Sequence, residues 1–444
     1  MKLTIVLAFV LIAIIISQTS TFVAYAQLSN NKTSSSAAIA PPQSSTAAKL
    51  IVIQNVINHG SGKKSASDFN IMVIGNSPLP HSFLGSFSGK TVMLHAGAYK
   101  VVENISSGYI PRYSTDCDST IRAGQTKTCL VTSEGIMRPL KNVVTTITGP
   151  FSGPEALAAD SVNGNVYVAN YGDYNKVGTV SVINGSRNVV SSNVLVDNNP
   201  TAVAYDYYNN NIYVANLFSN TVSDIDASTN RVLSSVPVYG IHPTGLGYDP
   251  ANNNIYVTNL DSKSFSVIDT STNFVIPNIP VAGNPQAVTY DYANGDTYIA
   301  MRVWGPNNET NGSVSIIDPK NNVIGNITVG IDPYAMAYDS VNKNIYVANF
   351  LSNTVSVINS LTNTVVTTIP VGLNPSGVAY DSANGFIYVS NVGRSNVSVI
   401  DGSNNTMIDS IPVGTYPYGI TYDPVNENIY VANLGSNNVS VIQP

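Results

Sequence analysis

One sequence element recurs seven times after residue 150, and it constrains the fold more than any other feature of the chain. The element is Pro-x-x, an apolar residue, x, Tyr or Ala, and Asp. Its aspartates stand 42 to 48 residues apart, at Asp160, Asp206, Asp249, Asp291, Asp339, Asp381 and Asp423. Three further short runs follow each aspartate except the last, as in NIYVAN (344–349), NTVSVIN (353–359) and NTVVTTIPVG (363–372). Four short strands in each period predict a β-propeller blade and not a helical solenoid.

The two ends of this repeated part complement each other. The last copy stops after its third run, NNVSVIQP (437–444), and a run that matches the missing fourth, NVVTTITG (142–149), precedes the first copy. Joining them would remove the exposed sheet edges of an open array. We therefore predict an all-β fold, with a seven-bladed β-propeller over residues 136–444 that is closed by its N-terminal strand and preceded by a small β-sandwich.

The second run of each copy is similar to the YVTN-type propeller repeats of archaeal and bacterial cell-surface proteins. The similarity is clearest in NNIYVTN (253–259) and extends over all seven copies. It implies an extracytoplasmic propeller of a kind often found in surface layers. It implies no particular reaction.

Residues 49–135 form a separate region of short alternating runs, such as KLIVIQNVIN, divided by Gly, Pro and Ser turns, and this predicts the β-sandwich. The stretch HAGAYKVVENISSGYIPRYSTDC (95–117) resembles the prealbumin-like and pilin-type domains of surface proteins, which usually serve as stalks or spacers. In the pilin subset, a glutamate at the position of Glu103 promotes a Lys–Asn isopeptide bond. Gln54 stands near the place of that lysine, so we expect no crosslink.

The chain has two cysteines, Cys117 and Cys129. In an exported protein, two nearby cysteines favour a disulfide, and two lone thiols lack the further ligands that zinc requires. The intervening RAGQ is typical of a hairpin turn, so we expect the bridge to join two neighbouring strands and to take the place of the crosslink.

The N-terminus predicts export. Residues 1–26 combine a basic start, an apolar stretch and the small-x-small pattern AYA, which is typical of a secretory signal peptide. Residues 27–48 are rich in Ser, Ala, Pro and Thr and predict a flexible linker. We expect an extracellular or cell-surface location, with an uncleaved N-terminal anchor as the less favoured alternative and no membrane span in the mature protein.

Charge composition narrows the class of partner. Charged residues make up 10% of the chain, and the net charge is −6. No basic stripe is present, which argues against a nucleic-acid partner. A protein or glycan of the cell envelope is the expected partner.

Positions that differ between the copies are where we expect function, because identical positions build the scaffold. The fourth copy, YIAMRVWGPNNETNGSVSII (298–317), carries an insertion with an arginine and the only Trp of the chain. A longer loop in the first copy and the connections into the innermost strands add tyrosines to the same loop face. The predicted binding residues are Arg302, Trp304, Tyr171, Tyr174, Tyr334, Tyr416 and Tyr418.

The alternative is an extracytoplasmic enzyme, lyase-like or hydrolase-like, with a divalent metal in the central channel. Its ligands would be Glu155, His242 and Asp332, the second of which is the single histidine of the repeated part. The sequence lacks C-x-x-C-H and G-x-S-x-G motifs. We therefore favour a non-catalytic protein without a cofactor.

Other polar residues of the repeats have a structural interpretation. The repeated Asp and Asn residues are expected to form turns, because their side chains bond local amides and they tolerate left-handed backbone. Asp224 stands where other copies have Val or Ile, and we expect it near the outer rim, where water would relieve its charge. The favoured glycosylation candidates are Asn184, Asn308, Asn311 and Asn404.

Overall fold

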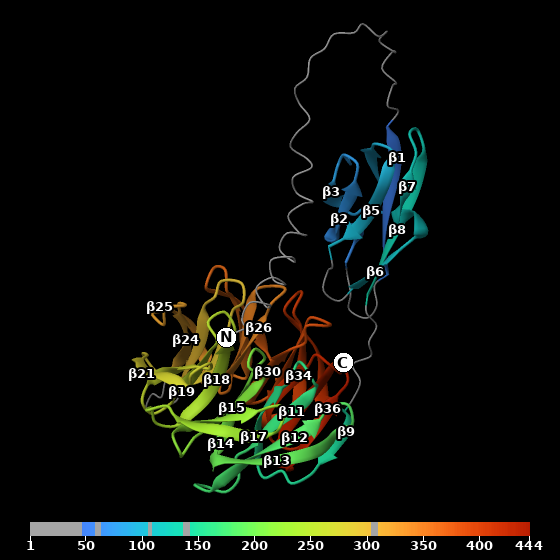
Figure 1. Cartoon of the computed structure of the whole chain (residues 1–444). Helices are drawn as coiled ribbons and strands as arrows, with labels where there is room; N and C mark the ends of the chain where they lie inside the picture. The colour runs from blue at the N-terminus through green and yellow to red at the C-terminus, as the bar shows by residue number, and fades with distance from the viewer. Residues whose placement is uncertain (1–46, 58–63, 105–108, 136–142, 303–309) are drawn as a thin grey trace, which may run out of the picture.

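The computed structural model describes residues 47–57, 64–104, 109–135, 143–302 and 310–444 (Figure 1). Their regular structure consists of strands and three short 3-10 helices, Ala66–Asp68, Thr115–Cys117 and Val392–Arg394. The strands form nine four-stranded sheets, so the fold is all-β, as predicted. Across these ranges, no helix has the length and apolar character needed to cross a membrane. The predicted signal peptide lies outside the described residues.

Two of the sheets lie before residue 136, in the orders β4-β1-β8-β6 and β3-β2-β5-β7. Their strands are β1 (Ala48–Ile57), β2 (Asn70–Gly75), β3 (Ser82–Leu84), β4 (Lys90–Leu94), β5 (Gly97–Glu103), β6 (Tyr109–Tyr113), β7 (Asp118–Ile121) and β8 (Thr126–Gly135). Alternate residues of both sheets, such as Leu50 and Val52 of β1 and Ile71 and Val73 of β2, bury their side chains in one shared core. The two sheets therefore pack face to face on one core.

Cys117 and Cys129 form the predicted disulfide, with their Cα atoms 4.7 Å apart. The expected placement of the bridge was wrong. Cys117 directly precedes β7, which pairs with β5, whereas Cys129 lies in β8 of the other sheet. The bridge therefore joins the two sheets through the core and does not join neighbouring strands of a hairpin.

Gln54, Glu103 and Ser133 form a buried hydrogen-bonded group between the two sheets. The Nε2 atom of Gln54 donates to Glu103 Oε2 at 2.9 Å and to Ser133 Oγ at 2.6 Å. The hydroxyl of Ser133 also donates to Glu103. Burial raises the pKa of Glu103 above its usual value, and the hydrogen bonds from Ser133 and Gln54 partly oppose this shift. Glu103 is thus held by hydrogen bonds from an amide and a hydroxyl.

The other seven sheets follow residue 142, and each runs from a first strand to a fourth (Figure 1). The first strands are β10 (Pro154–Ala159), β14 (Pro200–Asp206), β18 (Pro243–Asp249), β22 (Asn284–Tyr290), β26 (Pro333–Asp339), β30 (Pro375–Tyr380) and β34 (Pro417–Asp423). The second strands are β11 (Asn165–Asn170), β15 (Asn211–Asn216), β19 (Asn254–Asn259), β23 (Thr297–Arg302), β27 (Asn344–Asn349), β31 (Phe386–Asn391) and β35 (Asn428–Asn433). The third strands are β12 (Val177–Asn184), β16 (Thr221–Asp226), β20 (Ser264–Asp269), β24 (Asn311–Ile317), β28 (Thr354–Asn359), β32 (Asn396–Asp401) and β36 (Asn438–Ile442). The fourth strands are β13 (Val189–Asn198), β17 (Arg231–Pro237), β21 (Phe274–Pro280), β25 (Val323–Ile331), β29 (Thr364–Pro370), β33 (Thr406–Pro412) and β9 (Val143–Thr148).

The first strands form a ring. Each packs against the first strand of the next sheet, and β34 packs against β10. The seventh sheet is completed by β9, which pairs antiparallel with β36, so that Thr145 lies opposite Val441 and Ile147 opposite Val439. This is the pairing that the sequence predicts for the two ends of the repeated part. It leaves β36 paired along both edges.

The repeated aspartates build the turn after each first strand. In the first copy, Asp160 Oδ1 accepts the backbone N–H of Val162 at 2.8 Å and that of Asn163 at 3.3 Å. Every copy has the bond to the residue two positions on, and all seven aspartates are buried. This is an Asx turn, and it confirms the structural interpretation of these residues.

The repeated asparagines at the ends of the second strands are also structural. In the second of the seven sheets, Asn216 Nδ2 donates to Ser223 Oγ at 2.9 Å, on the adjacent third strand. The equivalent bond occurs in five other sheets. In the fourth sheet the position is occupied by Met301, whose side chain is buried. These amides therefore serve the packing between strands.

Buried tyrosines connect neighbouring sheets. The hydroxyl of Tyr346 in the fifth sheet donates to Asn405 Oδ1 in the sixth at 2.6 Å. Tyr430 of the last sheet makes the same bond with Asn188 of the first at 2.8 Å, although the two residues are 242 positions apart. A buried hydroxyl must find an acceptor, so each of these bonds specifies how one sheet sits against the next.

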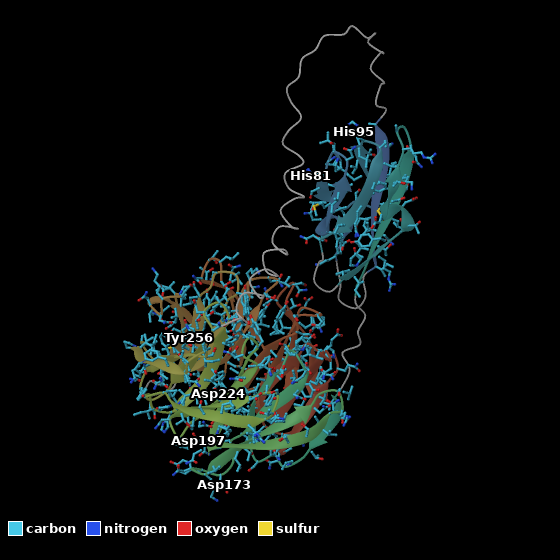
Figure 2. All side chains as sticks on the ribbon, in the orientation of Figure 1. His81, His95, Asp173, Asp197, Asp224 and Tyr256 are labelled. Atoms are coloured by element: carbon cyan, nitrogen blue, oxygen red, sulfur yellow. A yellow bond between two sulfur atoms is a disulfide. The ribbon has the colours of Figure 1, made fainter. Side chains whose placement is uncertain are left out.

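Asp224, labelled in Figure 2, is only 3% exposed, so the expectation that water relieves its charge was wrong. It lies on β16, the third strand of its sheet. Asn273 Nδ2 of the following sheet donates to its Oδ2 at 3.2 Å, and burial raises its pKa. Asn273 is therefore turned toward Asp224, and Tyr213 donates to the carbonyl of Thr270 at 3.5 Å instead of to an asparagine side chain.

Candidate functional site

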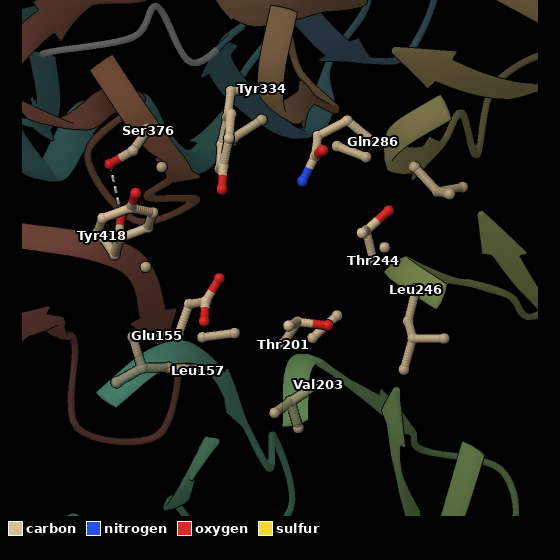
Figure 3. Close-up of a pocket in the computed structure, with 18 of the residues that line it drawn as sticks. Glu155, Leu157, Thr201, Val203, Thr244, Leu246, Gln286, Tyr334, Ser376 and Tyr418 are labelled. Atoms are coloured by element: carbon tan, nitrogen blue, oxygen red, sulfur yellow. Dashed lines mark hydrogen bonds between the residues drawn. The ribbon is translucent and has the colours of Figure 1, made fainter. Parts of the chain in front are cut away.

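The ring of first strands encloses a channel with a cavity of about 600 Å³ (Figure 3). Three successive positions of each first strand line it. The position after the proline is mostly polar, with Glu155, Thr201, Thr244, Gln286, Tyr334, Ser376 and Tyr418. Two positions on, every residue is apolar, namely Leu157, Val203, Leu246, Val288, Met336, Val378 and Ile420. The channel thus has a polar and aromatic ring beside an aliphatic ring.

The position between these rings carries only Ala or Gly, and the close approach of the first strands explains why. A Cβ atom on Gly419 would lie 2.5 Å from the carbonyl oxygen of Glu155. A Cβ atom on Gly377 would lie equally close to the carbonyl oxygen of Tyr418. Small residues let the strands pack, and strand geometry then directs the residues on either side toward the channel.

Glu155 is the only carboxylic acid among the described residues that line the cavity. Its carboxyl group is directed into the channel (Figure 3). Glu155 is partly buried in the channel wall, and burial raises its pKa to about 8. Its charge in turn raises the pKa of Tyr171, Tyr334 and Tyr418, whose own burial is the larger cause in each case. The acid is therefore mostly neutral at pH 7.

Arg302 lies at the end of β23 and also lines the channel. It forms a salt bridge with Asp332 through Nε, and its Nη2 donates to Asp332 Oδ2 at 3.1 Å. Its Nη1 donates to Gln286 Oε1 at 3.2 Å, and the guanidinium lies over the ring of Tyr334, 5.4 Å from the centroid. The charge of Arg302 is thus balanced by Asp332 within the protein. The guanidinium also holds the ring of Tyr334 in place.

The polar and aromatic ring forms the rim of the channel, and its aromatic side chains contact one another. The rings of Tyr334 and Tyr418 meet edge to face with their centroids 6.1 Å apart. Tyr334 also packs against Phe350 at 5.5 Å. Rings held in this way offer flat surfaces and hydroxyl groups to a ligand with little loss of side-chain entropy.

Hydroxyl groups complete the rim. The Oγ1 of Thr201 donates to the carbonyl of Pro243 at 3.2 Å, and that of Thr244 donates to the carbonyl of Pro285 at 3.3 Å. Ser376 Oγ donates to the carbonyl of Pro417 at 3.0 Å. These bonds connect successive first strands and fix the hydroxyl groups beside the channel.

The structure brings together four of the seven predicted binding residues, namely Arg302, Tyr171, Tyr334 and Tyr418. The side chain of Tyr174 is 74% exposed and packs on Phe218, outside the channel lining. Tyr416 is 56% exposed and does not line the cavity. Trp304 lies outside the described residues.

The alternative metal site is not assembled. Among the described residues, no three His, Cys, Asp or Glu side chains form a group that could hold a metal ion. His242 Nδ1 lies 2.6 Å from Asp261 Oδ2, and Asp332 is bound to Arg302, whereas Glu155 faces the channel. The proposal that Glu155, His242 and Asp332 converge was therefore wrong.

Of the predicted glycosylation candidates, Asn311 and Asn404 are exposed and Asn184 is partly buried. Asn308 lies outside the described residues.

The sequence analysis missed Thr244 and Ser376. Both residues directly follow the proline that recurs in every copy. Comparing the residue at this position in all seven copies would have found them.

No protein-family model matches the sequence, and the search of curated proteins gave no match either. Solved structures do match. One is hydrazine synthase of Kuenenia stuttgartiensis, with a TM-score of 0.59 and 20% identity over 68% of this chain and 98% of that chain. Another is the β-propeller domain of Cps50 (Swd1) of Myceliophteria thermophila, with a TM-score of 0.56 and 11% identity over 68% of this chain and 99% of that chain. At these identities the likeness concerns the fold alone, and it defines the chain as a β-propeller protein.

Proposed function

We propose that the chain is a non-catalytic binding protein of the cell surface or extracellular space, related to the YVTN-type repeat proteins. It holds a protein or glycan of the cell envelope at the mouth of its central channel. Its scaffold is a seven-bladed β-propeller, in which each of the seven sheets is one blade and β9 closes the ring. The two-sheet region before residue 136 serves as a spacer.

The cavity of about 600 Å³ with its aromatic rim is the observation that carries this proposal. Ligand pockets of this size combine apolar walls with a few fixed polar groups, as the rings of the channel do. Tyr171, Tyr334 and Tyr418 supply flat surfaces, and the aliphatic ring that contains Leu157 and Met336 supplies the floor. A polar molecule with an apolar face, such as a sugar ring or a peptide side chain, matches this arrangement.

The arrangement favours binding over hydrolysis. Hydrolysis of a glycosidic bond by acid–base chemistry commonly uses two carboxyl groups on opposite sides of the bond. In the part of the channel that the structure describes, Glu155 stands without a second acid, because Asp332 is bound to Arg302 and does not line the cavity.

Binding to isolated envelopes of the source organism tests the proposal. We expect the recombinant mature protein to bind saturably, and the double variant Tyr334→Leu/Tyr418→Leu to lose at least ten-fold in affinity. Tyr174→Leu is the matched control, because it removes an equally large ring from outside the channel. Equal binding by the double variant and wild type would refute a role of the channel mouth.

A further inference from the structure

Glu155 is an acid whose hydrogen-bonding capacity is left unused. Unlike the rim hydroxyls of Thr201, Thr244 and Ser376, its carboxyl group makes no hydrogen bond with any described residue, and it is directed into the cavity (Figure 3). A desolvated carboxyl group without a partner is unfavourable in its charged form. The ligand that relieves this penalty most completely is one that brings a positive charge.

Three tyrosines line the same cavity as this acid. Tyr171, Tyr334 and Tyr418 all line the same cavity, and all three are close enough to Glu155 for its charge to shift their pKa upward. Aromatic faces attract organic cations through the ring quadrupole, and this attraction strengthens when water is excluded. A carboxylate beside several aromatic rings is therefore a favourable environment for an organic ammonium ion.

Arg302 is the one basic residue among the described residues that line the cavity, and it is not paired with Glu155. The guanidinium of Arg302 is paired with Asp332 and donates to Gln286. In the ring of first strands, β10 with Glu155 is separated from β22 with Gln286 by two strands on one side and three on the other, and Figure 3 shows the two side chains across the channel from each other. The charge of Arg302 is thus balanced by Asp332, and its guanidinium lies over Tyr334 and not over Glu155.

We propose that the channel mouth recognises an organic ammonium group, which enters the cavity lined by Tyr171, Tyr334 and Tyr418 and pairs with the carboxylate of Glu155. The inference rests on the proposed binding function and names the chemistry of the bound group. Binding moves the proton of the carboxylic acid to the buffer, and the ammonium ion replaces it as the partner of the carboxylate. The ammonium group could belong to a free amine or to a lysine side chain of an envelope protein.

Calorimetric titration of the full mature chain with choline tests the inference. The control ligand is 3,3-dimethylbutan-1-ol, which has the same shape without the charge. We expect choline to bind at least ten-fold more tightly. At pH 7 the binding should release close to one proton, measured from the dependence of the heat on the ionisation enthalpy of the buffer. The other titratable groups that line the cavity with Glu155 are the three tyrosines, whose raised pKa keeps them neutral at pH 7.

Variants locate the binding. Glu155→Gln should weaken choline binding at least ten-fold and abolish the proton release, while Tyr174→Leu should change neither. Glu155→Gln removes no hydrogen bond found in the described part of the chain, so it is expected to fold. A second pair of ligands is Nα-acetyl-lysine methylamide and its uncharged norleucine analogue. Tighter binding of the lysine derivative than of choline would indicate a lysine side chain as the natural ligand, and the reverse order would indicate a free amine.

Equal binding of choline and its neutral analogue would overturn the inference, as would unchanged binding by Glu155→Gln. If no ammonium ligand binds but envelope binding still depends on Tyr334 and Tyr418, the ammonium inference fails and the proposed function stands. If envelope binding is also independent of these tyrosines, both fail.

Discussion

Arg302 and Asp332 form a salt bridge between two adjacent sheets at the rim of the channel, with Nη2 and Oδ2 3.1 Å apart. Arg302 occupies a position that in other sheets carries Tyr171, Leu217, Leu260, Phe350, Val392 or Leu434. Asp332 occupies the position before the proline, where three sheets carry asparagine. The pair is therefore a local departure from the repeat, made by two substitutions that compensate each other.

We predict that Arg302→Leu lowers the free energy of unfolding by about 3 kcal/mol, because it leaves the buried Asp332 without its charged partner. The double variant Arg302→Leu/Asp332→Asn restores residues found at these positions in other sheets. It should unfold within about 1 kcal/mol of wild type, since a buried ion pair contributes little net stability. Denaturant unfolding measures both values. Equal destabilisation by the single and double variants would contradict this account.

The bond between Tyr430 and Asn188 closes the ring of sheets. Tyr430→Phe removes a buried hydroxyl and leaves Asn188 without it, so we predict a loss of about 1 to 2 kcal/mol in the free energy of unfolding. Tyr346→Phe removes the equivalent bond to Asn405 at an internal junction and is the control. Chemical denaturation measures the free energy of unfolding of both variants. Similar losses would show that the junction between the last and first sheets is built like the internal ones, whereas no loss in Tyr430→Phe would contradict the role of this bond.

Asp224 is a buried acid at a position that is Val or Ile in other sheets. Its folded-state pKa is raised, chiefly by burial, so wild-type stability is highest below the unfolded-state value and falls as the pH rises through the folded-state value. We predict that Asp224→Val stabilises the protein by about 1 kcal/mol or more at pH 8 and that this gain shrinks toward pH 4. Thermal unfolding at both pH values measures it. A gain that does not depend on pH would argue that Asp224 is already neutral or is better solvated than the structure shows.

Glu103 imposes the same sign of pH dependence on the two-sheet region, because burial raises its pKa. Local stability should be highest below the unfolded-state pKa and should fall as the pH rises through the raised value. Glu103→Gln should flatten this dependence, since an amide can still accept hydrogen bonds from Gln54 and Ser133. Hydrogen exchange of the β1 amides between pH 4 and 8, corrected for intrinsic rates, measures it. An unchanged slope in the variant would place the titration elsewhere.

Much of the scaffold could be predicted because each strand of the repeat unit occurs in seven similar copies. The strand pattern, the Asx turns at residues such as Asp160 and the pairing of β9 with β36 all follow from the copies. The direction of single side chains could not be predicted at every position. His242, Asp332 and Tyr416 precede prolines and have positive φ angles of 57°, 59° and 49°, and none of them lines the cavity.

Contacts between different copies also lay beyond the sequence. The Arg302–Asp332 pair joins the end of a second strand to the start of the next first strand, and Asn273 reaches Asp224 from the neighbouring sheet. A repeat pattern shows which residues are equivalent within a copy. It does not show which columns of adjacent copies meet, because that depends on how the sheets pack.

The central claim is that the channel mouth is the binding surface, and hydroxyl-radical footprinting of the mature protein on its envelopes tests it most directly. The account predicts protection of Tyr171, Tyr334 and Tyr418, which line the cavity, and no change at Tyr174 and Tyr416, which are exposed outside it. Protection of Tyr174 and Tyr416, with the channel tyrosines unchanged, would contradict the claim and place the binding surface on the exposed loops.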